Sequence, residues 1–440
     1  MAEGALAGLL VLDLSQNISG PYCTKLLADY GATVIKIEKP IIGDDSRHAG
    51  PFPPPPNAIP HSPSAEGLGG FCRGESRIRP GGCSESGSGD HKDRPYRDTV
   101  NPANIDGLFL HLNTGKKSIT LDIDDKVGRD IFKRLAKQAD IVVENSKPGT
   151  MKKLGIDHAA LSKLKSDIIM ASISYFGQTG PCRDWSGCDL VAQAAGGLIH
   201  LTGEPGREPL KLPLSQAEYQ AGLNAAVAVL CAVFHRDACG EGQHIDVSVQ
   251  EAVASILEGA VSTYEYSGHV MQRIGPRHQQ KCPSTIMSTA DGYVHLQSGA
   301  YWDHFATLVE APQLTEPPLN SILRYRHTDE VEAAIRPWVE SHSTKEVFDA
   351  CCDWRIPCGM VLGVEELEGD PQYEARSYFR EIDHPEAGRL KYPGAPFKMS
   401  ETPADINRAP LLGEHNDEIF IDMLGMSRDE IGGLKERNVI

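Results

Sequence analysis

The sequence predicts an α/β fold in which a large domain, built on a Rossmann-like, doubly wound and mostly parallel sheet, is joined to a smaller α+β domain. Three observations support this prediction. Short apolar or β-branched runs alternate with segments of helical spacing in the first half of the chain. The chain has 440 residues, which is too long for one ordinary core. Residues 285–375 then form a separate group of strand and helix patterns.

The first elements predict the β-α-β opening of a parallel sheet. Residues 9–14 are an apolar run that ends in turn residues, 23–30 have helical spacing, and 33–37 form a second β-branched run. A dinucleotide-binding domain begins in the same way, and Glu38 stands where an acid could bind a ribose. The turn at 15–21 has no Gly-x-Gly-x-x-Gly, however, so a nicotinamide enzyme is disfavoured.

Residues 41–104 differ abruptly in composition, with many prolines, glycines, serines and charges. This pattern predicts a long, irregular insertion, and a solvated, partly mobile loop is favoured over a lid or an oligomer contact. Two cysteines and two histidines there could be imagined as a zinc site, but their spacing fits no standard pattern, so we expect no metal. These residues are Cys72, Cys83, His61 and His91.

Regular structure resumes at Leu108, where a helix over 127–138 and a strand over 141–145 predict another α/β unit. Residues 216–236 predict a long buried helix, ended by Gly240. A strand at 245–249 and a helix at 251–264 follow. We therefore place the large domain at 1–250 and a linker at 251–284.

The smaller α+β domain is predicted over 285–375. Its strands are expected at 293–297 and 359–364, and its helices near 301–308 and 345–352. Residues 376–440 return as an extended, proline-rich segment that completes the large domain, with a short last helix around 417–424.

The charge and composition exclude several partners. A net charge of -17 and a pI near 5.4 disfavour binding to nucleic acid or to anionic lipid surfaces. No run approaches the roughly 20 apolar residues of a membrane-spanning helix, and Met1 to Gly4 lack the features of a signal peptide. The 11 cysteines form no Cys-x-x-Cys pair and are expected to be reduced thiols. We expect a cytoplasmic protein.

Separated motifs outside the insertion resemble one enzyme family. They are Gly20-Pro21 with residues 31–38, Asn113 with Lys116-Lys117-Ser118, Val143-Glu144-Asn145 with Pro148-Gly149, Phe176 to Pro181 leading to Asp189, and the tail Ala409 to His415. Together they resemble the class III CoA-transferases, the CaiB/BaiF group that includes formyl-CoA transferase and related acyl-CoA racemases.

The resemblance implies covalent catalysis by a carboxylate. Glu218 stands at the start of a predicted helix, where the family normally has an aspartate nucleophile and where the helix dipole favours an anion. Such a carboxylate attacks an acyl-CoA thioester to give a mixed anhydride and then an enzyme-bound CoA thioester, which passes CoA to a second carboxylic acid. Shielding from water protects these intermediates from hydrolysis.

The resemblance also implies a site for coenzyme A, bound as an acyl-CoA substrate. The positions that would contact it are Asn17, Ile18, Lys39, Lys116, Asn145, Ser146 and Lys153. Lysine at two of them, Lys39 and Lys153, keeps the charge of the family's usual arginine but loses its bidentate fork. The family further implies an interlocked dimer, either a homodimer or a heterodimer with a paralogue.

Three departures from the family pattern leave alternatives open. Glu218 is one methylene longer than aspartate, Ile18 cannot donate to an oxyanion, and residues 279–289 lack a glycine run. The chain is therefore predicted to be either an active transferase using a donor such as succinyl-CoA, or a non-catalytic subunit paired with an Asp-bearing paralogue, as in two-subunit benzylsuccinate CoA-transferases. A racemase is less favoured, because Cys188 replaces that branch's histidine and is expected to be a buried thiol.

Overall fold

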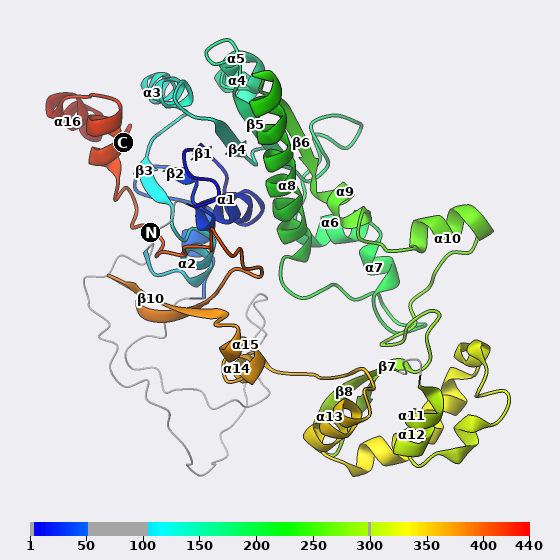
Figure 1. Ribbon diagram of the computed structural model, residues 1–440. Helices are drawn as coiled ribbons and strands as arrows, with labels where there is room; N and C mark the ends of the chain where they lie inside the picture. Colours follow the sequence, from blue (N-terminus) through cyan, green and yellow to red (C-terminus); the bar gives the residue numbers. More distant parts are fainter. Residues whose placement is uncertain (1–3, 52–103, 298–300) are drawn as a thin grey trace, which may run out of the picture.

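The computed structural model describes residues 4–51, 104–297 and 301–440. It consists of a large α/β part and a smaller part that is joined to it by two chain segments (Figure 1). Most of the predicted insertion, residues 52–103, lies outside the described residues, as do the four residues considered for zinc.

A six-stranded parallel sheet forms the centre of the large part. Its strands run in the order β3-β2-β1-β4-β5-β6, which is the doubly wound order expected of a Rossmann-like fold. The predicted α/β class is confirmed. The strands are β1 Leu10–Asp13, β2 Thr33–Glu38, β3 Lys117–Thr120, β4 Ile141–Glu144, β5 Ile169–Ser174 and β6 His244–Ser248.

The two faces of this sheet carry separate cores. Met170 of β5 packs in the core formed with α3 and the C-terminal helices, whereas its neighbours Ile169 and Ala171 pack against α1 and α8. This alternation follows from the period of two in a strand. The helices of the large part are α1 Ser19–Asp29, α2 Gly107–Leu112, α3 Lys126–Ala136, α4 Thr150–Leu154, α5 His158–Leu161, α6 Asp189–Ala195, α7 Leu198–Leu201, α8 Gln216–Cys239 and α9 Val249–Ala254.

A buried ionic network ties the first strand to its neighbours. Asp13, at the end of β1, accepts hydrogen bonds from Lys116 Nζ at 3.0 Å and from Thr24 Oγ1 of α1 at 2.6 Å. Lys36 Nζ lies 3.7 Å from Asp13 and 2.6 Å from Asp44, and all four charged side chains are fully buried. Asp13 also accepts from the backbone N–H of Ser15 at 2.9 Å, so the network fixes the loop that follows β1.

The first residues of the predicted insertion belong to the core. Arg47 lies in a short 3-10 helix, Asp45–His48, and donates to both carboxylate oxygens of Glu38 at 2.7 and 2.8 Å. Its guanidinium carbon lies 3.4 Å from the centroid of the Phe109 ring. The expected solvated loop is therefore wrong for this part, because a buried carboxylate on β2 requires a cationic partner.

Helix α8 is long, but it is buried on one side only. Its alanine-rich face packs on the sheet and on α1, while Phe234 is 81% exposed and Val227 is 55% exposed. The prediction of a buried helix is thus wrong for half of its surface. Among the described residues, α8 is also the one helix that is long and apolar enough to cross a membrane, a test that core helices of soluble proteins pass as well.

The smaller part has its own three-stranded antiparallel sheet, in the order β7-β8-β9. A core of its own contains Val294, Phe305 and Val347. Its elements are β7 Ser284–Ser288, β8 Tyr293–Gln297, α11 Trp302–Leu308, α12 Thr328–Ser341, α13 Thr344–Asp353 and β9 Cys358–Met360. Helix α12 was not predicted. The segment that leads from the large part contains α10, Ala260–Ser267, so the single helix expected at 251–264 is two helices.

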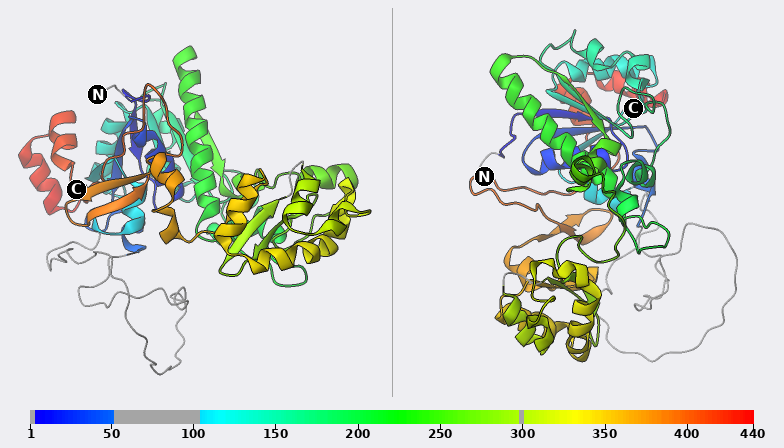
Figure 2. Two further views of the ribbon diagram at one scale, coloured as in Figure 1. Left: turned by 60° about the horizontal axis from the view of Figure 1, so that its bottom comes forward. Right: turned by 90° about the vertical axis from the view of Figure 1, so that its right-hand side faces the viewer.

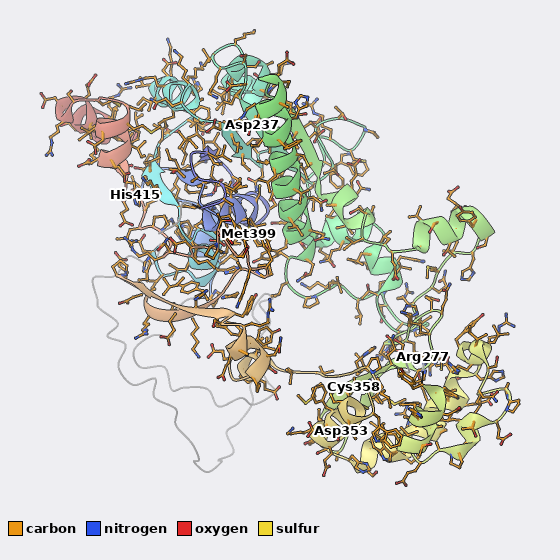
Figure 3. All side chains as sticks on the ribbon, in the orientation of Figure 1. Asp237, Arg277, Asp353, Cys358, Met399 and His415 are labelled. Atoms are coloured by element: carbon orange, nitrogen blue, oxygen red, sulfur yellow. The ribbon has the colours of Figure 1, made fainter. Side chains whose placement is uncertain are left out.

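The C-terminal segment returns along the large part. It contains α14 Val364–Leu367, α15 Pro371–Ala375, an unpredicted hairpin of β10 Phe379–His384 and β11 Gly388–Pro393, a π-helix Glu418–Met423 and α16 Arg428–Glu436. His415 lies beside β3, where its Nδ1 accepts from the backbone N–H of Ser118 at 3.1 Å (Figure 3). The ring of Phe397 stacks on Tyr30 of the segment after α1, 4.6 Å between centroids.

His384 in this hairpin is expected to make folding sensitive to acid. Backbone N–H groups of Glu386 and Ala387 donate to its Nδ1, which must therefore be unprotonated. Burial, aided by the cation of Arg408, lowers the pKa of His384 to about 4. The His384 side chain binds a proton near pH 6.5 in the unfolded chain, but only near pH 4 in the folded chain. The free energy of unfolding is therefore unaffected by this group above pH 6.5 and falls as the pH drops from about 6.5 to 4.

The expected loss is at most about 3 kcal/mol, since each pH unit of pKa shift corresponds to about 1.4 kcal/mol and solvent screens part of the shift. Urea unfolding followed by circular dichroism at several pH values measures it. In the variant His384→Asn, whose carbonyl can accept the same hydrogen bonds without titrating, the slope in this window should shrink. Equal slopes in the two proteins would exclude this origin of acid sensitivity.

Candidate active site

The strand order of the sheet reverses between β1 and β4, and the loops at their carboxyl ends meet at this point. In doubly wound sheets, ligands bind in the crevice at this point. The two loops are joined directly: Asn145 accepts from the backbone N–H of Gln16 at 2.8 Å and donates to its carbonyl oxygen at 2.7 Å. The predicted residues Asn17, Ile18 and Ser146 lie in the same two loops.

The backbone in these loops has a defined form. Asn17 is exposed and has a φ of 61°, a left-handed conformation that asparagine tolerates better than most residues. Ile18 is half-buried and directly precedes α1, without a side-chain cap. Ser146 donates its backbone N–H to Glu144 at 2.8 Å. Four of the residues predicted to contact CoA therefore lie in two neighbouring loops at the carboxyl ends of β1 and β4.

Glu218 lies in the first turn of α8 and is 9% exposed. Its Oε1 accepts a hydrogen bond of 2.6 Å from the hydroxyl of Tyr175, the residue that follows β5. Burial raises the pKa of Glu218, the hydrogen bond from Tyr175 opposes this rise, and the nearby Asp189 adds to it. The result is a shielded carboxylate whose ionised form is favoured by the hydrogen bond from the Tyr175 hydroxyl.

Asp189 fixes the start of the helix that carries Glu218. Its Oδ1 accepts from the backbone N–H groups of Ala217 at 2.8 Å and Glu218 at 3.2 Å, which the N-cap residue Ser215 leaves unsatisfied. Its Oδ2 accepts from Gln193 at 2.6 Å. Helix α6 thereby sets the position of the first turn of α8, and with it the position of Glu218.

Two glycines allow the close approaches that the site requires. A Cβ atom on Gly187 would lie 2.3 Å from the ring of Tyr175, so a side chain there would displace the hydroxyl that bonds Glu218. A Cβ atom on Gly222 would lie 2.5 Å from the carbonyl oxygen of Ser19. Helix α8 therefore contacts the N-terminal end of α1 one turn after Glu218, beside the crevice.

The three predicted lysines have different environments. Lys39, just after β2, and Lys153, on α4, are exposed. Lys116 is buried, and its Nζ donates to Asp13, to Asn113 at 2.9 Å and to the carbonyl oxygen of Pro21 at 2.9 Å. We assign Lys116 a structural role, since its ammonium group donates its hydrogen bonds to other groups of the protein.

Cys188 lies at the start of α6 and is exposed, so the expectation of a buried thiol is wrong. No cluster of three or more possible metal ligands occurs among residues 4–51, 104–297 and 301–440.

The sequence did not reveal Tyr175 as a site residue. Its only signal was its position directly after a buried strand, at the carboxyl edge of a parallel sheet. Asp189 was recognised as part of a motif, but its capping contact was not predicted. The arrangement as a whole offers a shielded carboxylate near the carboxyl ends of the parallel strands, which suits nucleophilic attack on an acyl substrate.

Comparison with known proteins agrees with this chemistry. A family model described as CoA-transferase family III matches residues 6–66 and 85–416. The succinyl-CoA–D-citramalate CoA-transferase of Chloroflexus aurantiacus is 30% identical over 436 residues, which cover 98% of this chain and 96% of that protein. The succinyl-CoA:mesaconate CoA-transferase of Haloarcula marismortui is 31% identical over 425 residues, covering 95% and 96%.

The fold has solved counterparts as well. A CaiB/BaiF family protein from Brucella suis has a TM-score of 0.77 and 28% identity, and the match covers 96% of this chain and 100% of that one. The family match spans nearly the whole chain and includes both the crevice and Glu218. The protein described here is therefore a member of CoA-transferase family III, the CaiB/BaiF group.

Proposed function

We propose that this protein moves CoA from an acyl-CoA donor such as succinyl-CoA to a carboxylic acid, with Glu218 as the nucleophile. The observation that carries the proposal is the shielded carboxylate of Glu218, held by Tyr175 beside the crevice. The names of relatives support the donor, because proteins about 30% identical to this chain are named succinyl-CoA-dependent CoA-transferases.

In the proposed reaction, the Glu218 carboxylate attacks the thioester carbonyl of the donor. The carbon–sulfur bond breaks, and the leaving CoA thiolate and an enzyme-bound mixed anhydride result. The thiolate then attacks the carbonyl carbon of Glu218, which releases the donor carboxylate and leaves a glutamyl-CoA thioester. The acceptor carboxylate attacks this thioester, and the same two steps in reverse deliver the new acyl-CoA and restore Glu218.

Different groups bind the two parts of CoA, its phosphates and its pantetheine arm. Lys39 and Lys153 supply positive charge for the phosphates on a chain that is otherwise strongly acidic. Asn17, Ile18 and the pair Asn145-Ser146 line the crevice for the pantetheine arm. Because Ile18 has no polar side chain, stabilisation of the oxyanion falls to other donors.

The proposal is tested by an assay of the purified chain with succinyl-CoA and a panel of carboxylic acids, including citramalate, malate, mesaconate and glutarate. Formation of the acceptor's CoA thioester is followed by chromatography and mass spectrometry. At least one acid should yield its CoA thioester at a rate that depends on the enzyme concentration. The absence of transfer to every acid, from protein that binds CoA, would contradict the proposed activity.

A change at Tyr175 is expected to move the pH dependence of this activity. The nucleophile must be ionised, so the rate falls as the pH drops through the raised pKa of Glu218. In Tyr175→Phe the opposing hydrogen bond is lost, so the pKa of Glu218 rises further and the acid limb should move to higher pH. A pH profile of kcat/KM measures this shift. A uniform loss at every pH would show a merely structural role for the hydroxyl.

We further propose that the protein functions as a dimer in the cytoplasm. Support comes from apolar side chains that α8 and α10 leave exposed, among them Phe234 at 81% and Tyr266 at 93%. One end of α8 projects beyond the neighbouring elements of the large part (Figure 2). The nine described cysteines are free, which fits a reducing compartment. Native mass spectrometry of the purified chain tests the dimer, and a persistent monomer at micromolar concentration would contradict it.

A non-catalytic subunit is the second candidate. One relative, 31% identical, is named the beta subunit of succinyl-CoA–L-malate CoA-transferase of Chloroflexus aurantiacus. Other relatives of similar identity carry no subunit designation in their names, and the carboxylate at Glu218 remains in place. These observations favour the active transferase.

A further inference from the structure

A cavity of about 270 Å³ lies on the face of the sheet opposite to Glu218. Met170 and Ser172 of β5 line it, whereas α8 covers the odd-numbered residues of the same strand. The end of β4, the loop from β4 to α4, α4 itself, α5, the start of β6 and the loop after β5 complete its walls. Glu144 and Lys147 of this lining flank Asn145 and Ser146, so the cavity and the proposed CoA site share one loop. The volume has room for several water molecules, at roughly 30 Å³ each, or for a small ligand.

Three residues that line this cavity each have a buried polar atom with no hydrogen bond partner among the described residues. These atoms are Nε2 of His158, Nε2 of Gln178 and Nε of Arg183. Two of them are obligatory donors, and the imidazole nitrogen becomes a donor when it carries the proton. Unsatisfied buried donors are rare in folded proteins, and three around one cavity indicate a missing acceptor.

Other contacts fix the ring of His158 and the backbone of Gln178. The ring of His158 stacks on His244, 5.8 Å between centroids, and His244 Nε2 lies 2.9 Å from Ser172 Oγ. The backbone N–H of Gln178 donates to Asp246 at 3.0 Å. For Arg183, the nearest carboxylate oxygen belongs to Asp184 at 3.9 Å, beyond hydrogen-bond distance of Nε. The donors therefore remain available.

The charges around the cavity favour an anion. Lys147, Lys152 and Arg183 supply three cations on a chain with a net charge of -17. Two carboxylates oppose them. Asp157 caps α5 by accepting from the backbone N–H of Ala160, and burial raises the pKa of Glu144.

We propose that this cavity binds a small oxyanion, either a carboxylate or a phosphate group, at a site separate from Glu218. The guanidinium of Arg183 and the amide of Gln178 donate to its oxygens, and His158 donates through Nε2. Donation from a guanidinium to an oxyanion is among the stronger hydrogen bonds in proteins. Binding of the oxyanion at this cavity is proposed independently of the transferase activity.

The loop after β5 connects this cavity with Glu218. Tyr175 bonds Glu218 on one face of the sheet, and Gln178, three residues later, lines the cavity on the other. Gly187, which makes room for the Tyr175 ring, follows Arg183 in the same loop. An anion that orders this loop would therefore also affect the hydroxyl that holds the carboxylate.

Isothermal titration of the full-length protein with inorganic phosphate, and separately with succinate, tests the site. At least one probe should bind, and the probe that binds more tightly identifies the source of the oxyanion. Arg183→Gln should weaken that binding at least tenfold. His158→Phe, which keeps a ring for stacking on His244 but removes Nε2, should weaken it at least threefold. Arg207→Gln, a change at an exposed arginine that does not line the cavity, should leave it unchanged.

A titration in the presence of saturating CoA distinguishes this cavity from the crevice. The proposal expects the probe to bind with the same affinity when CoA is present. Competition between the two would place the oxyanion in the CoA site and overturn the separate site. Absence of binding by either probe, or equal binding by wild type, Arg183→Gln and His158→Phe, would show that the cavity holds only water.

Discussion

Replacement of Glu218 by glutamine is expected to reduce CoA transfer by on the order of a thousandfold or more. An amide oxygen is a poor nucleophile and cannot form the mixed anhydride, whereas the loss of a covalent nucleophile typically removes most of the rate enhancement. The change is nearly isosteric, and the amide oxygen can still accept the hydrogen bond from Tyr175. Steady-state kinetics with the best donor and acceptor pair measure the loss.

Two further variants make this result specific. Glu316→Gln removes a similar charge from an exposed position in the smaller part and should leave the rate within twofold. Glu218→Asp keeps the charge but withdraws the oxygens by one methylene, and a displacement near 1 Å costs roughly a hundredfold. A Glu218→Gln enzyme that retains a tenth of the activity would show that another group attacks the thioester.

Loss of the carboxylate of Asp13 is expected to have the largest effect on stability. Asp13→Ala leaves the ammonium groups of Lys116 and Lys36 buried without their shared anion. Breaking a buried ion pair on one side costs about 3 to 5 kcal/mol, because the remaining charge stays desolvated. Burial already lowers the pKa of Lys116 to about 8 despite the attraction of Asp13. Without Asp13, the charged form of Lys116 loses the carboxylate that opposes this effect of burial.

Urea unfolding of the large domain, followed by circular dichroism, measures this loss. The Glu316→Gln variant serves as the matched control and should differ from wild type by less than about 0.5 kcal/mol. Asp13 also holds the backbone of Ser15 in the loop that enters the crevice, so CoA affinity should fall in the same variant. A change in the free energy of unfolding below about 1 kcal/mol would mean that the network contributes little to folding.

Much of the fold could be predicted because the signals were local. The strands and helices of the large domain show clear periodicity, and β1, β2 and β4 lie within two residues of their expected bounds. Helix α12 escaped prediction because Pro337 lies inside it and is typical of a helix end. The β10-β11 hairpin is rich in charges and buries few side chains, among them Ile382 and Tyr392, so its alternation was weak.

The site could be predicted only in part, for a physical reason. The position of Glu218 at a helix start was visible in the sequence, and the resemblance identified its motif. The hydrogen bond from Tyr175 joins residues 43 positions apart, and the ion pair of Lys116 with Asp13 joins residues 103 apart. Such contacts arise when the sheet brings distant loops together, and no periodicity encodes them. For the same reason the three donors around the cavity were not foreseen.

The most direct test of the account is mass spectrometry of the peptide that contains Glu218, after the protein has been incubated with succinyl-CoA and rapidly digested. We expect a covalent adduct on Glu218, either CoA joined through a thioester or the donor acyl group, and its absence in Glu218→Gln. Protein that binds CoA but gives no adduct with any donor, or an adduct that persists in Glu218→Gln, would contradict the assignment of Glu218 as the nucleophile.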